Sequence, residues 1–183
     1  ERPRDRVQPF SLLAVPGATA ADHLRAAQRM AQSYPAVPAM SHEPPAALAA
    51  PPRLRIGYLS SDLHDHATTH LIVEALELHD RTRFEIVGFD YSAAGTSAHR
   101  SRILGAFDRV VTIAGLSDTE AARRIVAEDI AIAVDLKGWT TGARPHILGS
   151  RPTPITVQWL GHPGTMGAPW IDYVIVDPIV APV

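Results

Sequence analysis

The stretch from Leu54 to His70 reads LRIGYLSSDLHDHATTH, which is the layout of a strand that leads into a helix. Residues 54–60 are mostly strand formers and predict a buried strand. The apolar stripe that follows predicts a helix over residues 68–79, with Thr68 or Thr69 as its cap. A polar loop rich in histidine and aspartate lies between the two. Such a loop stands where open α/β sheets bind ligands, outside the carboxyl end of a strand.

The same alternation of strand and helix continues along the chain. Strands are predicted at 54–60, 84–90, 109–113, 130–136, 155–160 and 173–177. Helices are predicted at 68–79, 97–107, 118–128 and 143–149. Apolar strands joined by short helical connections are typical of a parallel sheet that is covered on both faces. The predicted fold class is therefore α/β, a Rossmann-like parallel sheet with flanking helices, whose first strand is central and whose switch point is at residues 61–70.

Residues 1–52 differ from the rest of the chain. They hold nine of the 16 prolines and predict a Pro- and Ala-rich linker with one helix, from Ala20 to Tyr34, capped by Thr19. We expect that helix to pack on the main domain or on upstream sequence. Residues 53–183 form the Rossmann-like domain. Because the chain does not begin with Met and ends just after the last predicted strand, we expect it to be a piece of a longer protein.

The composition excludes several classes of protein. With 183 residues, of which 46% are hydrophobic and 20% charged, the chain is an ordinary globular one. Its formal net charge of -2 favours neither nucleic acid nor an anionic membrane as a partner. The absence of cysteine excludes disulfides and thiolate metal sites. No apolar run is long enough to span a bilayer.

The histidines of the opening stretch allow three interpretations. His66 lies just ahead of the predicted helix, whose positive end disfavours an imidazolium and leaves a neutral side chain suited to general-base catalysis. Alternatively, His64 and His66 share a divalent metal ion, with His162, Asp135 and Asp62 as candidates for the remaining ligands. In the third interpretation they are loop histidines without a ligand. The residues alone leave all three open.

Two further polar loops follow predicted strands. Asp135 ends one strand, so its carboxylate is expected at the same sheet edge as His66, or it caps a turn there. The run from Trp159 to Ala168, WLGHPGTMGA, has three glycines whose N–H groups can bind an anion or a sugar, or simply form a turn. The basic residues that are candidates for phosphate binding, or else surface charges, are Lys137, Arg144 and Arg151.

Three segments carry a resemblance to a known family: GYLSSDLHDHATTHLI, VDLKGWTTGARP and RPTPITVQWLGHPGTMGAPWIDYVIVD. They resemble the N-terminal catalytic half of the O-linked N-acetylglucosamine transferases, a family that includes the SPINDLY-type O-fucosyltransferases. The resemblance runs from Leu54 to Val183 and is greatest to the bacterial members.

The resemblance implies a fold and an activity. Members have two Rossmann-like lobes in a GT-B arrangement, of which this chain would be the first. They move N-acetylglucosamine from UDP-GlcNAc to Ser or Thr hydroxyls of proteins, with inversion and without a metal or other cofactor. The implied partners are the UDP-sugar, the acceptor protein, the second lobe and an upstream tetratricopeptide (TPR) region, and the implied compartment is the cytoplasm.

The resemblance also implies roles for single residues. It makes His66 the catalytic base and Asp135 its partner or proton relay. The chain departs from the family pattern at Lys137, where Asn or Ser is usual, and carries Trp139 where the family has an aromatic residue or His. The expected substrate-binding residues are Trp139, Thr140, His162, Pro163, Gly164 and Thr165.

Alternative functions come from other classes. The transferred sugar could be fucose, as in the SPINDLY branch. A metal-dependent hydrolase would use His64 and His66, and a non-catalytic module would bind peptide through the glycine-rich loop. For residues 1–183 alone we expect no measurable transfer, because the groups that stabilise the leaving diphosphate belong to the second lobe.

Overall fold

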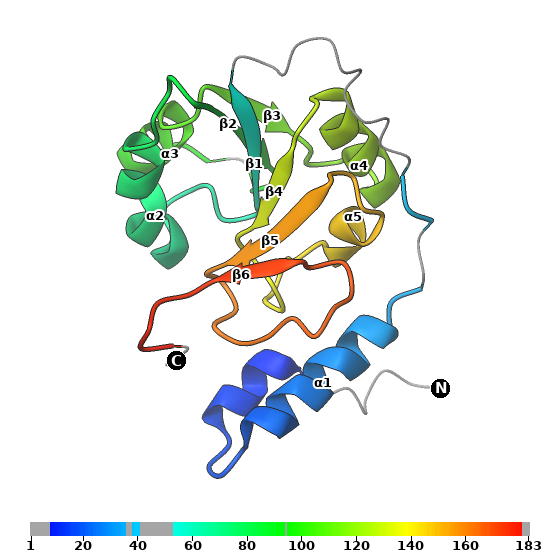
Figure 1. Cartoon of the computed structure of the whole chain (residues 1–183). Coiled ribbons are helices and arrows are strands. Elements are labelled where there is room, and N and C mark those ends of the chain that lie inside the picture. Colours follow the sequence, from blue (N-terminus) through cyan, green and yellow to red (C-terminus); the bar gives the residue numbers. More distant parts are fainter. Residues whose placement is uncertain (1–7, 36–37, 41–52, 94, 181–183) are drawn as a thin grey trace.

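The computed structural model of the chain describes residues 8–35, 38–40, 53–93 and 95–180. They form a six-stranded sheet in the order β3-β2-β1-β4-β5-β6, in which every neighbouring pair is parallel (Figure 1). The strands are β1 (Leu54–Ser60), β2 (Phe84–Asp90), β3 (Arg109–Thr112), β4 (Ile132–Asp135), β5 (Ile155–Trp159) and β6 (Tyr173–Ile175). The predicted fold class is confirmed, with β1 inside the sheet and the chain order reversing between β1 and β4.

Helices cover both faces of the sheet. The helical segments are η2 (Pro9–Ala14), α1 (Ala20–Gln32), α2 (Ala67–Glu77), α3 (Ala98–Gly105), α4 (Asp118–Ala127) and α5 (Pro145–Gly149). Helices α2 and α3 lie on one face, and α4 and α5 on the other (Figure 1). Adjacent strand residues therefore enter different cores: Tyr58 packs with α2 and α3, and Leu59 with α4 and α5. None of the helices in the described ranges has the length and apolar character needed to cross a bilayer.

The strand register aligns the carboxyl ends of the central strands. Leu59 of β1 lies beside Asp135, the last residue of β4, and Asp135 lies beside Gln158 of β5. The loops after these three strands consequently leave the sheet at one level. This alignment brings together the polar segments that are far apart in the sequence.

Helix α2 begins differently from the prediction. Its N-cap is His66, whose Nδ1 accepts the Thr68 N–H at 3.2 Å. Thr68 and Thr69 lie inside the first turn, and the Thr69 hydroxyl donates to the carbonyl oxygens of His64 and His66 at 2.6 and 2.9 Å. The prediction of a threonine cap is wrong, because the imidazole nitrogen takes the place that a hydroxyl oxygen usually fills.

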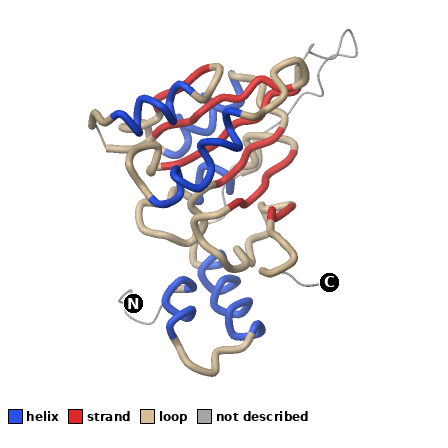
Figure 2. The backbone as a smooth tube through the Cα atoms, turned by 90° about the vertical axis from the view of Figure 1, so that its left-hand side faces the viewer, coloured by secondary structure: helices blue, strands red, loops and turns tan. Residues whose placement is uncertain are grey.

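Helix α1 packs below the carboxyl end of the sheet (Figures 1 and 2). Its buried face consists of Ala27, Met30 and Ala31, which contact Trp139 and Met166 in the loops after β4 and β5. The expected packing of this helix on the main domain is confirmed, as is its cap, Thr19. The linker predicted between this helix and β1 lies largely outside the described residues.

A capping box with Asp22 closes the N-terminus of α1 and gives a pH-dependent prediction. Hydrogen bonds from the hydroxyl and N–H of Thr19, with a further one from Arg25, lower the pKa of Asp22 from 3.8 to about 2. A carboxyl whose pKa is lowered by folding stabilises the fold above its unfolded pKa and loses that effect as the pH falls through the folded value. We therefore expect Tm to fall less between pH 4 and pH 2 in Asp22→Asn than in the unmodified chain. Equal losses, measured by circular dichroism, would contradict this.

Candidate active site

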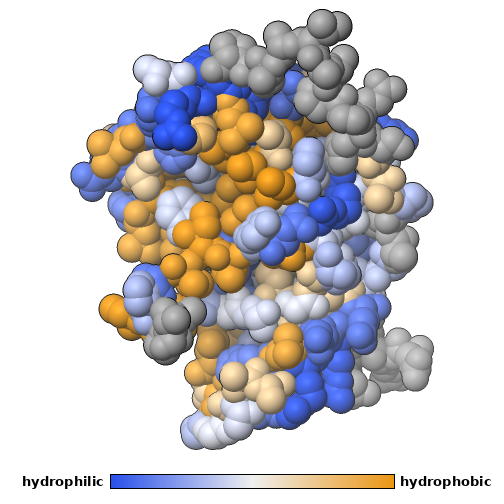
Figure 3. All heavy atoms as spheres, viewed as in Figure 1, coloured by the Kyte–Doolittle hydropathy of each residue, from blue (hydrophilic) through white to orange (hydrophobic). Residues whose placement is uncertain are grey.

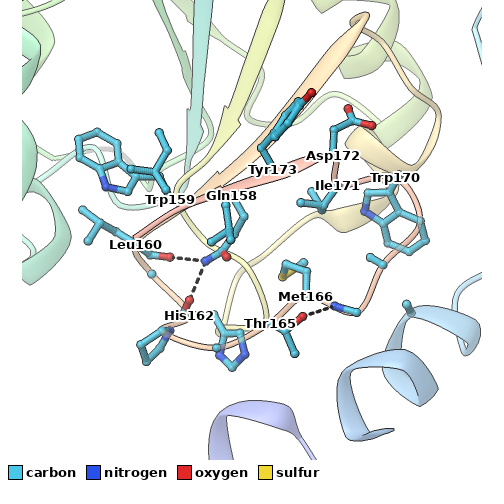
Figure 4. A pocket seen from close by; sticks show the side chains of 18 of the residues that line it. Gln158, Trp159, Leu160, His162, Thr165, Met166, Trp170, Ile171, Asp172 and Tyr173 are labelled. Carbon is cyan, nitrogen blue, oxygen red and sulfur yellow. Dashed lines mark hydrogen bonds between the residues drawn. The ribbon is translucent and has the colours of Figure 1, made fainter. Parts of the chain in front are cut away.

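A cleft of about 1880 Å³ opens at the carboxyl edge of the sheet. The start of α2 forms one wall, α1 another, and the loop after β5 lines most of the remainder (Figure 4). His66 and the segment from Gln158 to Ala168 both line it. The structure thus brings together two of the three polar loops singled out in the sequence, at one edge and around one cavity.

His66 lies where the sequence placed it, directly ahead of α2. Its side chain is 40% exposed, so a substrate in the cleft can reach it. Nδ1 faces the protein: it accepts the Thr68 N–H and is 3.7 Å from Oδ2 of Asp62. The side chain is therefore accessible from the cleft and has a carboxylate beside it, two features that suit a general base.

A buried ion pair stands behind His66. Nζ of Lys137 donates to Oδ2 of Asp62 at 2.6 Å, and their side chains are only 5% and 12% exposed. The interpretation of Lys137 as a phosphate ligand or a surface charge is wrong, because its ammonium is buried against a carboxylate. This pair was not predicted from the sequence. Its only signal was that the two residues closely follow β1 and β4, which are neighbours at the switch point.

The carboxylate of Asp135 caps the turn that directly follows it. Its carboxylate oxygens accept the N–H groups of Lys137 and Gly138 at 2.9 and 3.0 Å. Burial raises the pKa of Asp135, against the opposing effect of those two N–H donors and the nearby Lys137 ammonium. Among the described residues, the carboxylate next to His66 is Asp62 and not Asp135. The geometry favours the turn-capping alternative for Asp135, and its role as a partner of His66 stays a prediction.

Trp139 and Thr140 also serve the local structure. The indole of Trp139 is 4% exposed, donates from Nε1 to the carbonyl oxygen of Met166 at 2.8 Å, and stacks on Tyr34 at the end of α1. Its burial favours packing over the predicted contact with a substrate. The Thr140 hydroxyl donates to the carbonyl oxygen of Lys137 at 3.0 Å. Both side chains stabilise the conformation of the loop after β4.

The glycine-rich loop is held from below by Gln158. The Gln158 carboxamide is buried and donates to the carbonyl oxygens of Leu160 and His162 at 2.9 and 2.6 Å (Figure 4). Gly161 has φ of +65°, and a Cβ there would lie 2.3 Å from the carbonyl oxygen of Leu136. Gln158 and Gly161 thus fix the loop against the turn after β4. No role for Gln158 was predicted from the sequence.

The predicted binding residues of this loop divide into two groups. Pro163 and Thr165 are exposed and Gly164 is half-buried, all three lining the cleft. His162 lines it too but is 1% exposed, its Nδ1 has no hydrogen-bond partner in the described structure, and burial lowers its pKa. A low pKa keeps His162 neutral at physiological pH. Pro163 and Thr165 are the residues of this loop that a ligand meets first.

Comparison with known proteins gives the family. Residues 34–183 match the family described as glycosyl transferase family 41. The chain belongs to this family. A relative from Caenorhabditis elegans, named UDP-N-acetylglucosamine--peptide N-acetylglucosaminyltransferase, is 38% identical over 131 residues, or 71% of the chain and 11% of the relative. A relative from Arabidopsis thaliana, named as a probable enzyme of the same kind, SPINDLY, is 32% identical over 134 residues, or 70% of the chain and 14% of the relative.

A solved structure shares the fold. An O-GlcNAc transferase mutant of Thermobaculum terrenum superimposes with a TM-score of 0.82 at 26% identity, over 92% of this chain and 32% of that one. The chain is thus a Rossmann-like lobe that matches part of a GT-B enzyme. It spans between 11 and 14% of the length of the curated relatives cited above.

The metal interpretation finds no support in this family 41 lobe. Within the described ranges, no three His, Asp or Glu side chains come together in an arrangement that could hold a metal ion. The rings of His64 and His66 meet edge to face, with their centroids 5.7 Å apart. Nε2 of His70 lies 2.7 Å from Oδ1 of Asp65, and the His70 ring stacks on His99. The histidines of the opening stretch therefore do not converge on one ion.

The two arginines considered as phosphate ligands are engaged within the lobe. Arg144 donates to Oδ1 of Asp118 at 2.7 Å and to two backbone carbonyl oxygens. Arg151 donates to Oδ1 of Asp172 at 2.9 Å. Through these contacts, both guanidinium groups stabilise the loops around the sheet.

Proposed function

We propose that the protein carrying this chain is an inverting glycosyltransferase that moves N-acetylglucosamine from UDP-GlcNAc to Ser or Thr hydroxyls of proteins. The observation that carries the proposal is His66, an accessible imidazole at the cleft, beside the glycine-rich loop of a family 41 lobe. The names of the relatives support the donor and the peptide acceptor. This lobe would supply the acceptor side of the site.

The proposed chemistry is a single displacement. The acceptor hydroxyl attacks the anomeric carbon from the face opposite the diphosphate, the C–O bond to the diphosphate breaks, and UDP leaves with that electron pair. A ring nitrogen of His66 takes the hydroxyl proton. The carboxylate of Asp62, 3.7 Å from Nδ1, compensates the positive charge that develops on the ring.

The remaining assignments belong to the same proposal. Pro163, Gly164 and Thr165 would contact the sugar or the acceptor, since they line the cleft. A second lobe would bind the leaving diphosphate, a TPR region upstream of α1 would bind protein acceptors, and the enzyme would work in the cytoplasm. No metal would be required, because the diphosphate would be stabilised by side chains of the second lobe.

The test is a transfer assay on the protein that carries this chain. It would be incubated with an acceptor peptide and either UDP-GlcNAc or a nucleotide-activated fucose, and the peptide would be analysed by mass spectrometry. We expect a mass increase of one N-acetylhexosamine, unchanged by a chelator. Fucose in its place would identify the SPINDLY-type activity. Loss of transfer with the chelator would contradict the metal-free mechanism, and absence of any transfer would contradict the enzyme assignment.

A further inference from the structure

Two groups near Nδ1 of His66 require opposite protonation states of this nitrogen. The Thr68 N–H donates to it at 3.2 Å, which requires an unprotonated Nδ1 and leaves the hydrogen on Nε2. Oδ2 of Asp62 stands 3.7 Å away and can only accept, which requires a hydrogen on Nδ1. One nitrogen cannot satisfy both at the same time.

The choice of tautomer decides whether His66 can act as a base. With the hydrogen on Nε2, the exposed side of the ring is a donor and has no lone pair for the acceptor proton. With the hydrogen on Nδ1, Nε2 has a free lone pair. The cap contact in this structure corresponds to the first state, and the state that fits base catalysis needs Asp62 as the acceptor.

We propose that Asp62 is the positioning residue of His66: it accepts the Nδ1–H and so frees Nε2 to take the proton of the acceptor hydroxyl. The proposal rests on the proposed function, in which His66 is the base. The step balances, because the hydroxyl proton moves to Nε2 and the positive charge of the imidazolium is shared with the Asp62 carboxylate through Nδ1–H.

The surroundings of Asp62 suit this role. Its carboxylate is largely buried and held by two side chains: Ser61 Oγ donates to Oδ1 at 3.1 Å and Lys137 Nζ to Oδ2 at 2.6 Å. Its own N–H donates to Ser60 Oγ at 2.9 Å. The carboxylate is therefore fixed in orientation, and the ring needs to approach by less than about 1 Å to reach hydrogen-bond distance.

Lys137 completes the unit by compensating the charge of Asp62. A buried carboxylate without a partner is strongly destabilised, so the ion pair allows the charged Asp62 to lie behind the imidazole. Lys137 is a positioning residue that acts through Asp62, since its ammonium contacts the Asp62 carboxylate and not the ring of His66. Removing Asp62 alone would strand this ammonium, so a test must remove both charges.

The test is a double-mutant cycle in the protein that carries this chain. One arm is Asp62→Leu with Lys137→Met, which replaces the pair by apolar side chains of similar size. The other arm is His66→Ala, and the two are also combined. The matched control is Arg55→Met with Glu85→Gln. It removes an ion pair of 3.1 Å between β1 and β2 at the amino end of these strands, away from the cleft. For each variant, kcat for transfer from UDP-GlcNAc is measured, and Tm reports folding.

We expect the Asp62 and Lys137 double variant to lose about 100-fold in kcat when His66 is present, and less than about twofold when His66 is alanine. The control is expected to keep kcat within about twofold. A loss of similar size in both backgrounds would show a structural role and overturn the inference. If His66→Ala itself kept the normal rate, the proposed base would be wrong, which is a separate outcome.

A second measurement on the unmodified protein covers the case in which the double variant does not fold. Nitrogen-15 NMR of histidine-labelled protein reports which ring nitrogen of His66 carries the hydrogen. With UDP and acceptor peptide bound, we expect the hydrogen on Nδ1. A ring that keeps its hydrogen on Nε2 in that complex would overturn the inference, whatever the kinetics of the variants.

Discussion

Replacing His66 by asparagine is expected to reduce kcat for transfer of N-acetylglucosamine by about 100- to 10,000-fold, the range that a general base contributes. Asparagine is chosen because it is a favoured N-cap residue and can accept the Thr68 N–H in place of Nδ1. It has no basic nitrogen, so the cap is kept while the base is lost. The measurement is initial-rate transfer to an acceptor peptide, with binding of UDP followed separately and expected to stay unchanged.

The control for this prediction is the neighbouring histidine. His64→Ala removes an imidazole that contacts the His66 ring but does not line the cleft. Its transfer rate is expected to stay within about threefold of the normal value. If His66→Asn transferred sugar at the normal rate, the proton would go elsewhere, for example to an oxygen of the donor phosphate.

Gly161→Ala is expected to lower the free energy of unfolding by about 2 to 4 kcal/mol and to reduce transfer. The added Cβ would lie 2.3 Å from the carbonyl oxygen of Leu136 and 2.7 Å from that of Lys137, and both are backbone atoms that cannot rotate away. The φ of +65° adds strain for any residue with a side chain. Relief requires the glycine-rich loop to move off the turn after β4, which would displace the exposed Pro163 and Thr165.

Gly105→Ala is the matched control for this substitution. A Cβ at Gly105 meets nothing within 4 Å, and the residue ends helix α3. We expect its stability to be unchanged or raised by up to about 1 kcal/mol. Urea unfolding of both variants gives the comparison. Equal stability of Gly161→Ala and Gly105→Ala would mean that the loop accommodates a side chain after all.

The sequence was most informative where the pattern was continuous. The predicted bounds of β1 and β2 are those observed, because both strands are uninterrupted runs that are covered on two faces. For β4 the prediction over 130–136 is longer than the strand, Ile132–Asp135. Ile130 is buried in the core but lies before the ladder begins. Burial and strand pairing thus coincide in the centre of the sheet and separate at the ends of shorter strands.

The parts of the site that escaped prediction depend on contacts between distant segments. The pair of Asp62 and Lys137 joins residues 75 positions apart and exists because β1 and β4 are neighbours in the sheet. The burial of Trp139 depends on α1 docking beneath it, which local sequence does not encode. His66 was predicted ahead of α2 from a local pattern. Its cap contact was missed because histidine is not among the usual cap residues.

The edge strand β6 has a practical consequence for work on this lobe. Tyr173, Val174 and Ile175 are all exposed, and further exposed apolar side chains follow at Val176, Ile179 and Val180. An apolar area lies over this edge (Figure 3). In the described sheet β6 pairs only with β5, so one row of its backbone groups is open to another chain. We therefore expect the isolated lobe to self-associate through this strand, and a lysine introduced in β6 to reduce that association.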